Sequence, residues 1–575
     1  MNMETIKELA QDYIKRERHE LFRSDVLNAL EHGDAEGLND RFYQELTFGT
    51  AGMRGVIGGG TNRMNPLTVS MVTQGLAAYL SSSRDNPLAV IAYDSRNYSQ
   101  LFAETAASVL CANGIRAVMF RSLRPVPMLS FALRYLKADA GITITASHNP
   151  AEYNGYKVYW ADGAQVTPPH DEAIVAEVNA VRAQPREIPS ADLKEAQQKG
   201  LFGWIEQEVE EAYFQMVKSL ALRPELFASQ GDQMQVVYTA LHGSGLGPVQ
   251  RVLKDLGASV VTVEEQSEPN GDFPTVKNPN PEDPKAMALA LEYAKNHHAD
   301  IVLGTDPDAD RLGIAVPVNR NKTEYHLLTG NQIAVLLCDY LYSGRGQGSG
   351  KTGVTVKSIV TSDLVRSITE RWGGRCIDVL TGFKYIAQVM LELEQSSTEE
   401  FVLGAEESYG YLVETDVRDK DAVSAACMAV EMTKYHLNQR VSLLHRLEQI
   451  WSEFGYYEEL VISRTLPGQR GMKQILDLMN HFRTEPIDRI AGDQVVSRTD
   501  LLNDETSLPR SNMIIFRLEE GRTFMLRPSG TEPKIKCYIF ARSSLKDLEK
   551  AQSQAREVIR SYQEFFDKKL ALITG

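Results

Sequence analysis

The sequence predicts an α/β protein with three doubly wound domains on mixed sheets, followed by a C-terminal α+β domain. From residue 88 to residue 437, short β-branched runs alternate with helical segments, the pattern of sheets covered by helices. After about residue 455 the strands follow one another closely and one long helix ends the chain, which is typical of an antiparallel α+β domain. The length of 575 residues exceeds a single core and indicates roughly three to five domains.

The composition is that of an ordinary globular protein, with 43% hydrophobic and 24% charged residues. The net charge of −15 argues against nucleic acid and anionic membranes as partners. The five cysteines are far apart and form no CxxC or Cys-His pattern, so neither disulfides nor a zinc site are expected. No apolar signal-peptide core and no run of 18 apolar residues occur, and a cytoplasmic location is expected.

The first domain is expected to begin with a charged helix and a glycine-rich stretch over residues 46–65. This stretch is either a flexible turn or a backbone that approaches a ligand closely, with Arg54 as an anion clamp. Asn65 and Pro66 predict an N-cap and a first helical position. Beyond them we expect helices over 66–80, 99–114 and 124–138, strands over 88–95, 116–122 and 141–149, and a hairpin over 154–166.

The strand that ends this series is followed by the turn Ala-Ser-His-Asn-Pro, residues 146–150. The turn places the Ser147 hydroxyl at the carboxyl edge of a sheet, where open α/β folds bind ligands. Ser147 is therefore a candidate nucleophile or phosphate carrier. The alternative is a loop that only satisfies its own backbone. The following hairpin is expected to return Lys157 to the neighbourhood of Ser147.

Two further α/β units follow. Their expected strands cover 235–241, 259–265, 299–304, 352–360, 375–380 and 401–412, and their expected helices 246–257, 285–298, 331–343, 362–374, 383–395 and 421–437. The loop before the first helix nearly matches a dinucleotide fingerprint, but Pro248 occupies the third glycine position, so we reject a dinucleotide cofactor. The glycine-rich run 344–353 lacks the strand-to-helix context of a P-loop and is assigned as a surface loop.

Three carboxylates, Asp306, Asp308 and Asp310, come directly after an apolar strand. Their convergence in one loop is unfavourable unless a cation lies between them. Hard oxygen ligands favour Mg²⁺, with Ca²⁺ or Mn²⁺ possible, and the alternative is a solvated acidic loop. An EF-hand is excluded, because Arg311 replaces its glycine and Pro317 its bidentate glutamate.

Two more loops at strand ends carry polar groups suited to a phosphosugar. Over 527–534, Arg527, hydroxyls and a glycine backbone could cradle a phosphate, or form an ordinary β-turn. Over 404–410, Glu406, Glu407 and Ser408 suit sugar hydroxyls, which need donors and acceptors, although a helix-capping turn is the alternative. Lys384 lies in a loop that is uninformative alone. A cleft that combined all these loops would bind a phosphosugar.

The motifs TASHNP, TDPDADR, EESYG and RPSGTEPKIK, in this order, resemble those of the α-D-phosphohexomutase superfamily over nearly the whole chain. The opening FGTAGMRG and the length resemble the branch that holds phosphoglucomutases and phosphopentomutases. The resemblance implies an active-site cleft between four domains, which we expect to be a phosphoserine-loop domain, a metal-loop domain, a sugar-loop domain and a phosphate-loop domain over residues 1–217, 218–325, 326–455 and 456–575.

The resemblance also implies roles for individual residues. Ser147 would be the phosphorylated serine, and one Mg²⁺ per chain would be held by Ser147, Asp306, Asp308 and Asp310. Charge stabilisation or proton transfer is implied for Arg54, His148 and Lys157, with either of the last two as general base. Binding of the phosphoserine or the substrate is implied for Arg311, Lys384, Glu406, Ser408, Arg527, Ser529, Gly530 and Thr531.

The activity implied is the interconversion of glucose 1-phosphate and glucose 6-phosphate, with glucose 1,6-bisphosphate as activator and intermediate. Glucose is favoured because the sugar loop reads Glu-Glu-Ser-Tyr-Gly, while mannose and pentose phosphates are also possible substrates. A bisphosphate synthase, a phosphatase and a non-catalytic phosphosugar-binding protein remain open as well. A monomer or weak homodimer is expected.

Overall fold

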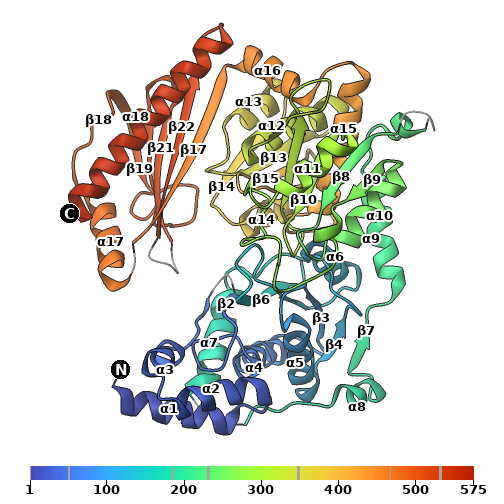
Figure 1. The fold of residues 1–575 in the computed structure, drawn as a ribbon, viewed down its shortest axis with the longest axis vertical. Helices are drawn as coiled ribbons and strands as arrows, with labels where there is room; N and C mark the ends of the chain where they lie inside the picture. The colour runs from blue at the N-terminus through green and yellow to red at the C-terminus, as the bar shows by residue number, and fades with distance from the viewer. Residues whose placement is uncertain are drawn as a thin grey trace. The chain divides into compact units, whose positions relative to one another are not determined.

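The computed structural model describes residues 2–49, 52–183, 187–228, 233–345, 350–466, 468–529 and 534–574, with the side chains of 468, 469 and 574 left out. The chain divides into two compact units. The first unit comprises Met1–Gly330, Ile386–Gly404 and Ser408–Tyr435. The second unit comprises Asn331–Tyr385, Ala405–Glu407 and His436–Gly575. Figure 1 shows the elements of each unit.

The N-terminal segment folds into three helices, α1 (Met3–Arg16), α2 (Glu20–Glu31) and α3 (Ala35–Phe42). The sequence indicated only the first of them. They share a small apolar core that includes Tyr13 and Phe42, whose rings meet edge to face at 5.9 Å. The helices therefore form a packed addition to the first sheet domain.

The first sheet has seven strands in the order β1-β2-β6-β5-β3-β4-β7. Strands β5, β3, β4 and β7 are parallel, while β1, β2, β6 and β5 pair antiparallel, so the sheet is mixed as expected. The strands are β1 (Phe48–Gly49), β2 (Gly52–Val56), β3 (Leu88–Tyr93), β4 (Arg116–Met119), β5 (Ala140–Ile144), β6 (Tyr153–Trp160) and β7 (Phe202–Trp204). The helices of this region are α4 (Pro66–Ser83), α5 (Ser99–Ala112), α6 (Val126–Tyr135), α7 (His170–Ala183), α8 (Leu193–Gln198) and α9 (Gln207–Ser219).

Helix α4 begins as the sequence predicts. The Asn65 side chain accepts a hydrogen bond from the Thr68 amide, Thr68 reciprocates in a capping box, and Pro66 occupies the first turn. The glycine-rich stretch before it is more ordered than a flexible turn, since it contains β1 and β2. Strand β2 pairs with β6, and a Cβ added to Gly155 on β6 would lie 2.5 Å from the Thr145 carbonyl oxygen. Glycine is thus required where these backbones meet.

The second sheet has the order β12-β11-β10-β8-β9, with β10, β8 and β9 parallel and β11 and β12 added antiparallel. Its strands are β8 (Gln235–Thr239), β9 (Ser259–Thr262), β10 (Ile301–Thr305), β11 (Leu312–Pro317) and β12 (Tyr325–Leu327). The accompanying helices are α10 (Leu246–Leu256) and α11 (Ala288–His297). Strand β10 is buried along its whole length, which fixes the position of the acidic loop that follows it.

The third sheet has the order β14-β13-β15-β16. Its strands are β13 (Thr352–Ser358), β14 (Arg375–Val379), β15 (Glu399–Glu406) and β16 (Gly410–Leu412). The expected strand over 401–412 is thus divided, and Tyr409 adopts a left-handed φ of 67° at the break. The helices of this region are α12 (Gly330–Arg345), α13 (Leu364–Arg371), α14 (Phe383–Leu393), α15 (Ala422–Asn438) and α16 (Leu443–Phe454). Residues 346–349 of the expected surface loop at 344–353 lie outside the described residues.

The C-terminal region is α+β, as predicted. Its strands have the order β17-β22-β21-β20-β19-β18, with every pair antiparallel. They are β17 (Tyr456–Thr465), β18 (Arg489–Ile490), β19 (Asp493–Asp500), β20 (Ile514–Leu518), β21 (Thr523–Pro528) and β22 (Lys534–Ser543). Helices α17 (Gly468–Thr484) and α18 (Leu548–Thr574) supply Phe482 and Tyr562 to a core shared with Phe516 and Phe524.

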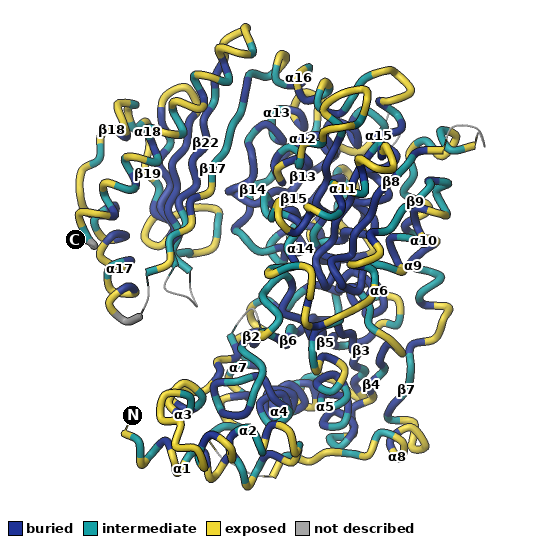
Figure 2. The backbone as a smooth tube through the Cα atoms, in the orientation of Figure 1, coloured by how far each residue is buried: buried dark blue, intermediate teal, exposed yellow. Residues whose placement is uncertain are grey.

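Burial follows the sheets. The central strands are buried, and the exposed residues concentrate on loops and outer helix faces (Figure 2). All five cysteines belong to the described residues, and each is buried with a free thiol. Within the described residues, no helix is both long and apolar enough to cross a bilayer.

Candidate active site

Ser147 lies in a buried turn just after β5. Its side chain donates a 2.7 Å hydrogen bond to Oδ2 of Asp306, and Nδ1 of His148 lies 3.2 Å from the same hydroxyl. The Ser147 backbone has a φ of 52°, in the left-handed region that disfavours residues with a Cβ. The backbone amide donates to the Thr145 hydroxyl at 2.9 Å. The turn thus aims the serine hydroxyl at the acidic loop of the neighbouring sheet.

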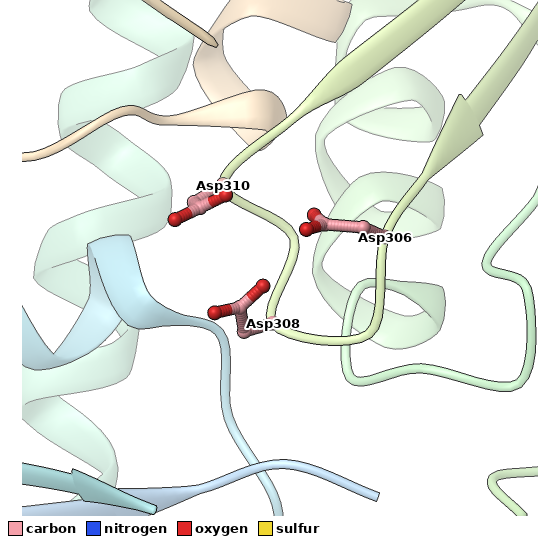
Figure 3. A group of neighbouring side chains, drawn as sticks. All are labelled: Asp306, Asp308 and Asp310. Atoms are coloured by element: carbon pink, nitrogen blue, oxygen red, sulfur yellow. The ribbon is translucent and has the colours of Figure 1, made fainter. Parts of the chain in front are cut away.

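The three aspartates at the end of β10 form one cluster. Each is at most 2% exposed, and one carboxylate oxygen from each lies within 4.8 Å of the others. Figure 3 shows the three carboxylates around a common point. The Ser244 amide and hydroxyl donate to the carbonyl oxygen of Pro307 at 2.8 and 2.7 Å and hold the loop. The glycine-rich loop that resembled a dinucleotide motif therefore supports the aspartates.

The electrostatics of the cluster favour a bound cation. Burial, and then repulsion from the neighbouring aspartates, raises the pKa of Asp306 well above its usual value. Burial and the Asp308 charge also raise the pKa of Asp310. Oδ1 of Asp308 and Oδ1 of Asp310 are buried and accept no hydrogen bond. Buried carboxylate oxygens with unused lone pairs fit a hard divalent cation such as Mg²⁺.

Two lysines lie against the cluster. Lys157, on β6 opposite Thr143, places its Nζ 3.1 Å from Oδ2 of Asp308. Burial alone would raise the pKa of Asp308, but Lys157 and the hydrogen bonds around it lower the value. Lys420 lies 3.0 Å from Asp310. The sequence predicted that the hairpin would return Lys157 to the neighbourhood of Ser147. It did not identify Lys420 as a site residue, because no local pattern sets this lysine apart within its acidic segment.

The remaining residues predicted for this part of the site are basic. Arg311 donates to Oε1 of Glu282 at 2.7 Å and to the Ser408 carbonyl oxygen at 3.0 Å. Arg54 donates to Oδ1 of Asn149, in the Ser147 turn, at 3.1 Å. Burial, with the charges of Arg311 and Arg54, lowers the pKa of His148 well below its usual value. The lowered pKa favours the neutral imidazole. The sequence did not identify Glu282 as the partner of Arg311.

The sugar-loop residues lie in both units. In the second unit, Oε1 of Glu406 accepts a hydrogen bond from the Gly382 amide at 2.8 Å. Glu407 accepts from the Ser358 hydroxyl at 3.0 Å, and burial with the Glu406 charge raises its pKa to about 7. Nζ of Lys384 lies over the ring of the next residue, 5.5 Å from the Tyr385 ring centroid. Ser408 belongs to the first unit, where its backbone meets Arg311.

The predicted phosphate loop is described only at its stems. Arg527 is the last residue but one of β21 and lies opposite Lys536 on β22. The Ser529 amide donates to the Lys534 carbonyl oxygen at 2.7 Å, which joins the two stems. Gly530 and Thr531 lie outside the described residues. The two strands thus bring positive side chains together at the place where the sequence predicts a phosphate.

Four family models match the chain, over residues 45–185, 211–319, 329–454 and 478–558. They are described as phosphoglucomutase/phosphomannomutase alpha/beta/alpha domains I, II and III and the C-terminal domain. Together they cover more than half of the chain. The chain belongs to the phosphoglucomutase/phosphomannomutase family. The resemblance seen in the motifs is therefore confirmed, as is the succession of three α/β domains and a C-terminal α+β domain.

Curated members of the phosphoglucomutase/phosphomannomutase family are similar over most of their length. A phosphoglucomutase of Staphylococcus epidermidis is 39% identical over 525 residues, which are 89% of this chain and 93% of that protein. A phosphoglucomutase of Staphylococcus aureus is 38% identical over 510 residues, 87% of this chain and 90% of that protein.

Solved structures of the same family share the fold. The open form of the Paramecium phosphoglucomutase pp63/parafusin has a TM-score of 0.70 at 16% identity and covers 92% of this chain and 96% of its own. A putative phosphomannomutase from Thermus thermophilus has a TM-score of 0.67 at 23% identity, with 91% and 99% covered.

Proposed function

We propose that this protein is a phosphoglucomutase that interconverts α-D-glucose 1-phosphate and glucose 6-phosphate through a phosphoserine at Ser147. One observation carries the proposal. The Ser147 hydroxyl, in a strained buried turn, donates to an aspartate of a three-carboxylate cluster contributed by another sheet. Strain of this kind is kept at functional sites. The relatives named phosphoglucomutase supply the reaction class.

The reaction consists of two transfers. Phosphoserine 147 gives its phosphoryl group to the free hydroxyl of the sugar monophosphate, whose proton passes to a base. The Ser147 oxygen takes up a proton as the phosphoryl group leaves, and glucose 1,6-bisphosphate forms. The other phosphate then returns to the Ser147 oxygen, which gives its proton to the base, and the leaving sugar oxygen regains a proton. The base is His148 or Lys157, as the sequence indicated. Nδ1 of His148 lies 3.2 Å from the serine oxygen, within reach of a proton exchanged there.

The positive groups around Ser147 stabilise charge on the transferring phosphoryl group. Lys157, Lys420 and Arg311 lie within 4.0 Å of the aspartates, and Arg54 is tied to the same turn through Asn149. Mg²⁺, held by a Ser147 phosphate oxygen with Asp306, Asp308 and Asp310, would add further neutralisation of phosphoryl charge when bound.

Substrate binding is assigned to the residues predicted from the motifs. Glu406 and Ser408 would bind sugar hydroxyls, Lys384 would also bind the substrate, and the loop after Arg527 would bind the phosphate that is not transferred. Ser529, Gly530 and Thr531 complete that loop. This assignment requires a cleft shared by the four predicted domains, whose closure would keep water from the bisphosphate.

The test compares kcat/KM for α-D-glucose, mannose and ribose 1-phosphates, with Mg²⁺ and catalytic glucose 1,6-bisphosphate. We expect glucose 1-phosphate to be the best substrate. A preference for mannose or ribose 1-phosphate would assign a phosphomannomutase or phosphopentomutase instead. Release of inorganic phosphate as the main product would assign a phosphatase, net formation of a bisphosphate a synthase, and binding without turnover a non-catalytic phosphosugar-binding protein. The cytoplasmic location and the monomer or weak homodimer stay predictions.

A further inference from the structure

Arg96 connects the end of β3 to the Ser147 turn. It is only 3% exposed, although it carries a permanent charge. One terminal nitrogen donates to the carbonyl oxygens of Ser147, at 2.5 Å, and Asn149. The other donates to the carbonyl oxygens of Pro150 and Tyr153, at 2.8 and 3.0 Å. A single side chain thus binds four carbonyl groups of one turn.

These contacts act on a backbone that is unfavourable by itself. Ser147 has a φ of 52°, and such a conformation in a residue with a Cβ persists only when its surroundings hold it. The amide of Ser147 is bound by the Thr145 hydroxyl, and its carbonyl by Arg96. Both polar groups of the strained residue are therefore fixed by neighbouring side chains.

The guanidinium is itself held on two sides. Asp94 lies 3.4 Å from its Nε and accepts from the Ser99 hydroxyl at 2.7 Å and from the Arg96 amide at 2.9 Å. The centroid of the Phe273 ring, from the loop after β9, lies 5.0 Å from the guanidinium carbon. Because a planar group between an ion pair and an aromatic face has few alternative positions, its donors are pre-oriented.

We propose that Arg96 is a positioning residue that keeps the Ser147 oxygen, and the phosphoryl group it carries, aligned for transfer to the sugar. The proposal rests on the proposed function. None of the four hydrogen bonds from Arg96 to the turn involves the predicted sugar loop or the predicted phosphate loop. Its loss should therefore affect the rate of transfer far more than substrate binding.

The test begins with Arg96→Lys, which keeps the positive charge but offers one nitrogen in place of two. Since small misplacements of reacting groups cost about 10²-fold in rate, we expect kcat to fall about 100-fold with KM little changed. The matched control is Arg522→Lys in the C-terminal region, where a 6% exposed arginine pairs with Asp493 and Glu520. It should lower thermal stability comparably and leave kcat unchanged.

A second readout separates positioning from general destabilisation. Each protein is incubated with glucose 1,6-bisphosphate, and phosphate on Ser147 is measured by mass spectrometry. The loaded enzyme is then mixed with glucose 1-phosphate, and transfer to the sugar is compared with release of inorganic phosphate to water. We expect the ratio of transfer to release to fall at least about tenfold in Arg96→Lys and to stay unchanged in Arg522→Lys.

The outcomes distinguish the two proposals. If the wild-type protein takes up no phosphate at Ser147, the proposed function itself fails. If the wild type is phosphorylated and Arg96→Lys transfers at the wild-type rate, the role of Arg96 is wrong and the function stands. If Arg96→Lys does not fold, the same ratio of transfer to release is measured in Phe273→Leu, which removes only the aromatic face beside the guanidinium. A lower transfer ratio in that variant supports the positioning role, and an unchanged ratio overturns it.

Discussion

The Ser147 hydroxyl donates to Oδ2 of Asp306 at 2.7 Å, across 159 positions of sequence and between two different sheets. Ser147 follows β5 of the seven-stranded sheet, and Asp306 follows β10 of the five-stranded sheet. Two strand ends that meet in this way bring the proposed phosphoryl carrier to the proposed cation-binding cluster. Substitutions on either side of this contact should therefore impair different parts of one reaction.

Ser147→Ala should abolish mutase turnover. The variant lacks the oxygen that carries the phosphoryl group, so neither half of the reaction can occur. Turnover of glucose 1-phosphate and uptake of phosphate from glucose 1,6-bisphosphate are the measurements, and the thermal midpoint should stay close to that of the wild type. Ser82→Ala, at an exposed position of α4, is the control. Full activity of Ser147→Ala would refute the phosphoserine assignment.

Asp308→Asn should weaken the response of activity to Mg²⁺. The change removes one charge from the cluster and the partner of Lys157. We expect the Mg²⁺ concentration for half-maximal activity to rise at least about tenfold, with a matching loss of affinity in calorimetric titration of Mg²⁺ alone. Asp300→Asn, which alters an aspartate paired with Lys322 just before β10, is the control. An unchanged metal titration would contradict the assignment of the triad.

Arg527→Ala should raise KM for glucose 1-phosphate by about 10- to 100-fold, because charge-assisted hydrogen bonds to phosphate contribute about 1.5–3 kcal/mol. Arg527 lies at the end of β21 beside Lys536, and its removal should change the thermal midpoint little. Steady-state kinetics provide the measurement. Arg498→Ala, on the exposed surface of β19, should leave KM unchanged. If KM for Arg527→Ala also stayed constant, the phosphate would bind elsewhere.

Glu459→Gln should change how stability depends on pH. Burial raises the pKa of Glu459 on β17 to about 7, although the hydrogen bond with Ser362 acts in the opposite direction. Between about pH 4.5 and pH 7, the folded protein therefore keeps a proton on this carboxyl group that the unfolded chain has released. This contribution to stability is complete below about pH 4.5 and is lost as the pH rises through about 7.

Glutamine cannot ionise and avoids this loss. Relative to the wild type, Glu459→Gln should therefore gain stability between about pH 4.5 and pH 8, by up to about 3 kcal/mol. Urea denaturation of both proteins at several pH values is the measurement. Glu557→Gln, at an exposed position of α18, should show no such trend. Parallel pH profiles for Glu459→Gln and the wild type would contradict a raised pKa.

The elements that the sequence predicted share a strong local signal. The Asn65–Pro66 start of α4, the buried strands before Ser147 and Asp306, and the antiparallel C-terminal sheet were all foreseen. Strands β1 and β2 were not, because glycine-rich strands carry no apolar alternation and form only where β6 accepts them. The break between β15 and β16 was not predicted either. Tyr409 has a left-handed backbone there, and a tyrosine in the sequence does not indicate that conformation.

The site shows the same division. The motifs identified Ser147 and the three aspartates as candidates, and the hairpin placed Lys157 near them. Lys420, Glu282 and Arg96 were not identified, because each acts through a contact with residues far away in the sequence. A lysine in an acidic segment, or an arginine after a strand, usually indicates only a solvated surface.

The sequence by itself determined the family, the order of the domains and the chemical groups available, because these depend on residue types at fixed local spacings. The tertiary structure alone decided which of those groups meet. It set the 2.7 Å contact of Ser147 with Asp306, the lysines that flank the aspartates, and the arginine that holds the turn. Such contacts arise when separate sheets pack and bury charge, so their partners are fixed by the whole fold.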